Sequence, residues 1–236
     1  NKDLNRCFLV EDLENLTLSS YEDLRAKEIN NLFGKNGKTP VDLIVDLHST
    51  TSNMGITIII DNDQPFNLQL AAYLNHIDPS VKVFCHENSG QSPNFLMSVG
   101  RFGIGIEVGS IPQGVLNADF FLKTEAMIKA ILDYVQMYNQ GELPSLSDNL
   151  IYYKYREKID YPRNEQGEIQ AMIHPDLQFK DYQVLHPGDP MFLTFDGQII
   201  SYQGNSTVYP VFINEAAYYE KGTAMCFTEK RMITLE

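Results

Sequence analysis

The chain has 236 residues, 43% of them hydrophobic and 21% charged, so it is long enough to bury a core without needing disulfides or metals for folding. Its 18 Lys and Arg against 31 Asp and Glu give a net charge of −13, a balance that repels phosphate backbones and argues against nucleic-acid and membrane partners. No apolar run approaches the roughly 20 residues of a membrane span. Three widely spaced cysteines without a Cys-x-x-Cys motif are typical of reduced thiols, so we expect a cytoplasmic protein.

Helical and strand-like patterns alternate over the first two thirds of the chain. Helices are predicted over residues 21–33, 66–77 and 119–138, and strands over residues 41–47, 55–60, 81–85 and 103–109. The strands are almost continuously apolar, which predicts a parallel or mixed sheet flanked by helices on both faces. The expected buried stripe of the last helix is Ile128, Ile131, Leu132, Val135 and Tyr138.

The composition changes near Gly141, where a polar, proline-containing connection over residues 142–149 follows the last helix. Beyond it the helical period vanishes, and strands are predicted over residues 151–159, 191–195, 198–202 and 207–213. Asp196-Gly197 predicts a hairpin, and Pro210 should confine the last strand to a sheet edge or a bulge. The sequence therefore predicts an α/β domain over residues 1–142 and a smaller β-rich domain over residues 143–236.

The sharpest local feature is Asp46-Leu-His48, which ends a buried strand just before the small polar run of residues 49–53. Ligand sites in open α/β sheets gather at the carboxyl ends of strands. Asp46 and His48 share one strand face, so one could bind a metal while the other orients a neighbouring ligand. A core histidine bonded to a carbonyl group is an equally good interpretation of this stretch alone.

Glu107 interrupts an apolar strand between Gly105 and Gly109. A buried carboxylate costs several kcal/mol unless it has a partner, so a functional role is favoured. Burial raises the pKa of a carboxyl group, which suits a general base. The alternative is a structural ion pair with an arginine.

Two further segments carry candidate binding residues. Asn5 and Arg6 offer a neutral donor and a planar cationic fork for a carboxylate, although a tetrapeptide of this kind is more often solvated surface. Tyr218 follows the last predicted strand, where paired tyrosines usually pack but a phenol can also reach a substrate across a domain boundary.

Taken together and in chain order, six segments resemble the succinylglutamate desuccinylase/aspartoacylase family of carboxypeptidase-like zinc hydrolases. They are residues 3–6, 46–55, 105–109 with 112–116, 161–163, 186–190 and 207–221. The most specific is the last, Thr-Val-Tyr-Pro-Val-Phe-Ile-Asn-Glu-Ala-Ala-Tyr-Tyr-Glu-Lys. The resemblance spans almost the whole chain.

The resemblance implies an α/β fold of the zinc carboxypeptidase type, a mixed sheet flanked by helices, with a smaller β-rich C-terminal domain. It also implies an amidohydrolase with one Zn²⁺ per chain that splits a small anionic N-acyl amino acid, typically N-acetyl-L-aspartate. In that pattern His48 is a zinc ligand and Glu107 is the base. Asn5 and Arg6 hold a substrate carboxylate, and Tyr218 closes on the substrate from the second domain. A homo-oligomer is among the assemblies that the sequence leaves open.

Two features depart from the family pattern. The other two zinc ligands of the family lie in a His-x-x-Glu motif upstream of residues 3–6, with an arginine between the two segments, and none of these is present. We expect that an N-terminal segment has been omitted, the alternative being an inactive carboxylate-binding relative. In addition, the arginine that grips the second carboxylate of acetylaspartate is replaced by Met97, with Arg101 as a candidate substitute. An acylase for other N-acyl amino acids therefore remains open.

Overall fold

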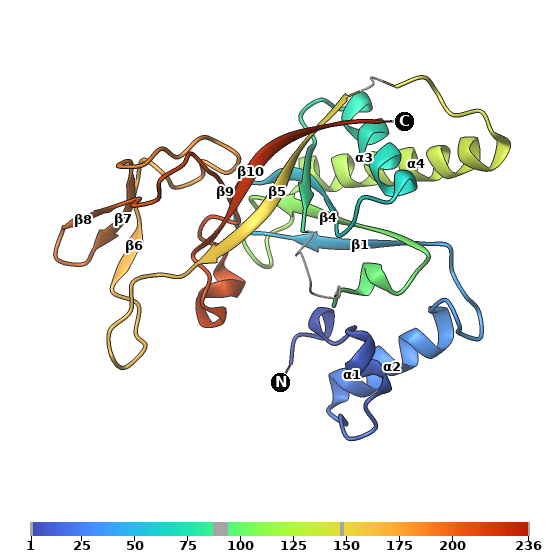
Figure 1. The fold of residues 1–236 in the computed structure, drawn as a ribbon, viewed down its shortest axis with the longest axis horizontal. Coiled ribbons are helices and arrows are strands. Elements are labelled where there is room, and N and C mark those ends of the chain that lie inside the picture. The colour runs from blue at the N-terminus through green and yellow to red at the C-terminus, as the bar shows by residue number, and fades with distance from the viewer. Residues whose placement is uncertain (1, 87–93, 147–148, 236) are drawn as a thin grey trace.

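The computed structural model describes residues 2–86, 94–146 and 149–235. Its centre is a mixed sheet of seven strands (Figure 1). They are β1 (Leu43–Ser49), β2 (Gly55–Ile60), β3 (Lys82–Cys85), β4 (Phe102–Gly109), β5 (Asn149–Ile159), β9 (Tyr209–Val211) and β10 (Met225–Thr234). The order across the sheet is β1-β4-β2-β3-β5-β10-β9. The pairs β1–β4, β2–β3 and β3–β5 are parallel and the other three are antiparallel, so the predicted mixed sheet is confirmed.

Helices cover both sides of this sheet. Figure 1 shows α3 (Pro65–Ile77) and α4 (Ala118–Gln140) on one side, and α1 (Val10–Glu14) and α2 (Tyr21–Phe33) on the other. The main core lies between the central strands and the α3–α4 pair, where Ile58, Leu70 and Ile104 are fully buried. Within the described ranges, none of the helices has both the length and the apolar composition to cross a membrane.

The buried face of α4 differs in part from the predicted stripe. Met127, Ala130, Ile131 and Tyr134 are buried at helical spacing, whereas Leu132 is 64% exposed. Successive residues of a helix lie about 100° apart, so burying Ile131 turns Leu132 away from the sheet. The predictions for Leu132 and for Tyr138, which is 41% exposed, were therefore wrong.

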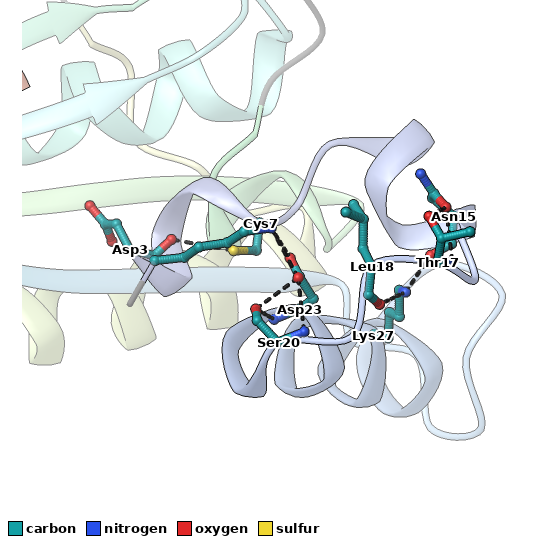
Figure 2. A network of polar contacts seen from close by, with 9 residues as sticks. Asp3, Cys7, Asn15, Thr17, Leu18, Ser20, Asp23 and Lys27 are labelled. Carbon is teal, nitrogen blue, oxygen red and sulfur yellow. Dashed lines mark hydrogen bonds and ion pairs between the residues drawn. The ribbon is translucent and has the colours of Figure 1, made fainter.

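Polar contacts fix the start of α2, as Figure 2 shows. Ser20 and Asp23 form a reciprocal capping box, and Asp23 also accepts hydrogen bonds from Lys2 Nζ at 2.8 and 2.9 Å. Lys27 Nζ donates to the carbonyl oxygen of Leu18 at 2.6 Å. These contacts tie the first residues of the chain to α2, next to the short helix η1 (Leu4–Arg6).

The C-terminal part combines three strands of the main sheet with a separate small sheet of β6 (Ala171–Ile173), β7 (Pro190–Thr194) and β8 (Ile199–Ser201). The predicted hairpin at Asp196-Gly197 joins β7 to β8, and β9, which contains Pro210, is an edge strand as expected. The smaller β-rich C-terminal domain of the predicted fold class is confirmed. The exact division at residue 142 stays a prediction.

Strand β10 was not predicted. It carries the charged run Glu229-Lys230-Arg231, which masks its alternation in the sequence, yet it lies between β5 and β9 in the sheet. Before it, the short helix η3 (Ala216–Lys221) leads from β9 back towards β10.

Candidate active site

A cavity of about 410 Å³ lies at the carboxyl ends of β1 and β4. These parallel strands place His48 and Glu107 directly opposite each other in the register. Helices η1 and η3 supply further lining residues, so the cavity brings together Asn5, Arg6, His48, Glu107 and Tyr218. All five predicted site residues therefore line one cavity, although they come from four elements of the chain.

His48 is held by two neighbours. Its Nε2 lies 2.8 Å from Asp46 Oδ2, and Asn5 Nδ2 lies 3.0 Å from the same ring nitrogen and 2.9 Å from the Asp46 carboxylate. The hydrogen bond to Asp46 raises the pKa of the His48 imidazole. A carboxylate on one ring nitrogen is the usual way in which proteins orient an imidazole that binds a metal through the other.

Glu107 is 7% exposed. Burial raises the pKa of its carboxyl group to about 7, against the opposing charge of His48 and with support from the carboxylates of Glu215 and Asp46. A carboxyl group with this pKa exchanges its proton readily at neutral pH, which is what a general base and acid requires.

Arg6 carries a charge that the described part of the chain does not neutralise. Its Nη1 donates to the backbone oxygen of Asn5 at 2.9 Å, and its guanidinium carbon lies 4.6 Å from the ring centre of Phe95. No carboxylate of the described residues forms an ion pair with it. In a protein with a net charge of −13, an arginine left open in a cavity is a strong candidate to bind an anionic ligand.

Tyr218 enters the cavity from η3. Burial raises the pKa of its phenol, so the hydroxyl group stays protonated, and within the described residues this hydroxyl has no hydrogen-bond partner. The neighbouring Lys221 lies 5.4 Å from the Tyr218 ring centre and forms a 2.8 Å ion pair with Asp3. Asp3 therefore ties η3 to the start of the chain.

The described residues do not form a complete metal site. Among residues 2–86, 94–146 and 149–235, no three His, Cys, Asp or Glu side chains lie close enough together to hold a metal ion. A catalytic zinc usually has three protein ligands, so His48 and its neighbours do not complete such a site by themselves. The arrangement of His48 is compatible with one ligand, since Asp46 occupies Nε2 and leaves Nδ1 without a partner in the same ranges.

Glu215 was not singled out in the sequence, yet it joins the C-terminal segment to the β1 end. It is 3% exposed and accepts hydrogen bonds from the Thr50 hydroxyl group, from Thr51 N at 2.7 Å and from Thr51 Oγ1 at 3.1 Å. Its other oxygen accepts from Ala217 N at 3.0 Å. A glutamate just after an apolar strand was the available signal, whereas Glu107 was singled out because it interrupts one.

Asp181 also connects the C-terminal segment to the residues that follow β1. Its carboxylate accepts hydrogen bonds from Ile213 N at 3.0 Å and from Asn53 N at 3.1 Å. Burial raises the pKa of Asp181 to about 6, although these backbone donors act in the opposite direction. Asp181 lies in a polar stretch of the sequence, and nothing there distinguishes it from a surface residue.

Met97, which stands in place of the family's arginine, and Arg101, its candidate substitute, occupy different environments. Met97 is 4% exposed and lines the cavity. Arg101 is exposed, lies 4.9 Å from the ring centre of Phe102, and is not among the lining residues. The structure therefore does not place Arg101 where it could replace an arginine at position 97.

Comparisons with known proteins agree with this arrangement. Residues 1–135 match the profile of the succinylglutamate desuccinylase/aspartoacylase catalytic domain, and residues 148–230 match that of the AstE/AspA barrel-sandwich hybrid domain. The chain is 58% identical to a probable aspartoacylase of Nostoc sp. (strain PCC 7120), with 98% of this chain and 79% of the relative covered. It is 47% identical to mouse aspartoacylase, over 97% of this chain and 75% of the relative.

A second branch of relatives is also similar. The human N-acyl-aromatic-L-amino acid amidohydrolase (carboxylate-forming) is 41% identical over 99% of this chain and 75% of its own length. The crystal structure of murine aminoacylase 3 superposes with a TM-score of 0.93 at 39% identity, covering 99% of this chain and 78% of that chain. The relatives thus include proteins named for two different groups of substrates.

Proposed function

Because the chain belongs to the succinylglutamate desuccinylase/aspartoacylase family, whose named relatives are amidohydrolases, we propose that it carries out zinc-dependent hydrolysis of the amide bond of an N-acyl amino acid. The products are a carboxylate and a free amino acid, and N-acetyl-L-aspartate is the reference substrate that the sequence suggests. The observation that carries this proposal is Glu107, a buried carboxyl group with a pKa of about 7 opposite His48.

The residues of the cavity divide the work. Arg6, with Asn5 beside it, binds the α-carboxylate of the substrate through charged hydrogen bonds. Glu107 takes a proton from the attacking water and passes it to the departing amine, so that one C–N bond breaks and one C–O bond forms. Tyr218 donates its phenolic hydrogen to the bound substrate from η3.

One zinc ion per chain is part of the proposal. When bound, zinc lowers the pKa of a coordinated water and polarises a carbonyl group. His48 would supply one ligand, and the remaining ligands would have to come from outside the described residues. Within the cavity, the role of Asp46 is to keep the His48 ring in one orientation.

Turnover by the full-length, zinc-loaded protein tests this function. We expect hydrolysis of at least one member of a panel containing N-acetyl-L-aspartate and the N-acetyl derivatives of apolar, aromatic and basic amino acids. Undetectable turnover of every member would reject the proposal.

A non-catalytic carboxylate-binding protein is the second candidate function. The absence of a three-ligand cluster among the described residues favours it. Elemental analysis of the full-length protein separates the two, because about one tightly held zinc per chain is incompatible with a relative that has lost its metal.

A further inference from the structure

The cavity lining includes a connected group of aromatic rings, which we call the aromatic wall. It consists of Phe84, His86, Phe95, Tyr155, Phe212 and Tyr218. Each ring is in contact with the next: the ring centres of Phe95 and His86 lie 5.0 Å apart, and those of His86 and Tyr155 lie 4.9 Å apart in a stacked arrangement. The contacts continue from His86 through Phe84 and Phe212 to Tyr218, at 5.9, 6.0 and 5.6 Å.

The aromatic wall begins where the substrate carboxylate is expected to bind. Arg6 stacks on Phe95, so the guanidinium that holds the α-carboxylate touches the first ring of the wall. The α-carboxylate and the side chain of an amino acid leave the same carbon atom. A substrate anchored by Arg6 must therefore place its side chain within a few bonds of the anchoring site, where Phe95 lies with His86 in contact with it.

The charges around the cavity do not favour a second carboxylate at this wall. Burial, with a smaller contribution from the charge of Arg6, lowers the pKa of His86 to about 4, so its ring is neutral at neutral pH. Met97 is apolar, and Lys221 is already paired with Asp3. Among the described residues that line the cavity, the remaining cation is Lys158, which is exposed on β5.

A carboxylate placed against the aromatic wall would lose hydration without gaining a fixed cation, whereas an aromatic side chain would exchange water for ring contacts. The described part of the cavity thus resembles a pocket for an apolar group, with a few polar groups at one end.

We propose that the aromatic wall binds the substrate side chain, and that the protein prefers N-acyl derivatives of aromatic and large apolar L-amino acids to those of aspartate. This inference rests on the deacylase function proposed above. It assigns the side-chain specificity of the site to His86, Phe95, Met97 and Tyr155.

The ratio of kcat/KM for N-acetyl-L-phenylalanine to that for N-acetyl-L-aspartate tests the preference in the full-length, zinc-loaded protein. We expect a ratio of at least about 10, the discrimination that a well-fitted apolar pocket provides. A ratio below 1 would overturn the inference while leaving the deacylase function intact. Hydrolysis of neither substrate, nor of any other member of the panel, would instead reject the function on which it rests.

Substitution of Tyr155 tests the wall itself. Tyr155→Ala should raise KM for N-acetyl-L-phenylalanine about tenfold with little change in kcat, and should therefore lower the ratio of kcat/KM for N-acetyl-L-phenylalanine to that for N-acetyl-L-aspartate. The matched control is Arg101→Gln, which lies outside the cavity and should leave the substrate ratio unchanged. An unchanged ratio in a folded Tyr155→Ala protein would contradict the role of the wall.

Lys158 provides the opposing test. If Lys158 receives a side-chain carboxylate, Lys158→Ala will lower kcat/KM for N-acetyl-L-aspartate by tenfold or more and spare N-acetyl-L-phenylalanine. That selective loss would overturn the inference. Equal effects on the two substrates would support it.

Discussion

The cavity has two walls that differ in origin and in chemistry. The polar wall consists of Asn5, Arg6, Asp46, His48 and Glu107, and comes from η1 and from the adjacent strands β1 and β4. The aromatic wall comes from β3, β5, η3 and the segments next to them. Under the proposed function, His48 and Glu107 of the polar wall act on the amide bond, and the rings of the aromatic wall contact the substrate side chain, with Tyr218 also donating its phenolic hydrogen. The comparison suggests that reaction and substrate choice are separable in this protein.

The largest expected effect is on the reaction itself. Glu107→Gln keeps the shape of the side chain but removes the group that accepts and returns the proton, so we expect kcat to fall by about 10³-fold on every substrate. Steady-state kinetics of the full-length protein measure this effect, and elemental analysis should show unchanged zinc. Retention of wild-type kcat would show that Glu107 does not transfer the proton in the reaction.

Arg6 should affect binding of all substrates in the same way. Arg6→Gln removes the charged partner of the α-carboxylate, so we expect KM to rise roughly 10- to 100-fold for N-acetyl-L-phenylalanine and N-acetyl-L-aspartate alike. An increase in KM that is confined to N-acetyl-L-aspartate would show instead that Arg6 binds the side-chain carboxylate. In that case the polar wall would also contribute to substrate choice.

Substitution of Glu215 tests the hydrogen bonds that connect the C-terminal segment to the end of β1. Glu215→Gln turns one carboxylate oxygen into a donor that faces backbone or hydroxyl hydrogen atoms, so we expect the free energy of unfolding to fall by about 2 kcal/mol. Denaturant unfolding measures the change. The matched control is Glu220→Gln, an exposed residue of the same segment, for which we expect no measurable loss of stability. Equal stabilities of the two variants would contradict a structural role for Glu215.

Substitution of Asp181 should have a smaller effect on the free energy of unfolding, and this effect should depend on pH. Its pKa of about 6 lies above the ordinary value of 3.8, so the folded state binds the proton more tightly than the unfolded state does. The carboxyl group therefore contributes stability at low pH that is lost as the pH rises through 6. Relative to Asp181→Asn, the wild-type free energy of unfolding should fall by about 1 kcal/mol between pH 5 and pH 7. A difference that is constant over this range would contradict the raised pKa.

The polar wall could be predicted from the sequence, whereas the aromatic wall, apart from Tyr218, could not. Asp46, His48 and Glu107 are conspicuous because charged or polar residues stand at the ends or in the middle of apolar strands, where burial is costly without a reason. Phe84, Phe95 and Phe212 have no such signal, because an aromatic residue in a strand or turn is usually part of a core. Only the folded chain shows that their rings form one surface beside Arg6.

The elements of the fold also divide into those with a local sequence signal and those without one. The elements with a clear period, such as α2 and β2, have the predicted bounds at 21–33 and 55–60. Strand β10 escaped prediction because its charged residues hide the alternation, and its place is set by pairing with β5 and β9, which lie far from it in the sequence. Long-range pairing of this kind is not visible in a local pattern.

The separation of reaction from substrate choice is tested most directly by the ratio of kcat/KM for N-acetyl-L-phenylalanine to that for N-acetyl-L-aspartate, measured in the wild type, in Glu107→Gln and in Tyr155→Ala. We predict that Glu107→Gln lowers both values by the same large factor and leaves the ratio unchanged. We predict that Tyr155→Ala lowers the ratio about tenfold while much of the activity on N-acetyl-L-aspartate remains. A ratio that changes in Glu107→Gln and stays constant in Tyr155→Ala would contradict the division of the cavity into a reacting wall and a selecting wall.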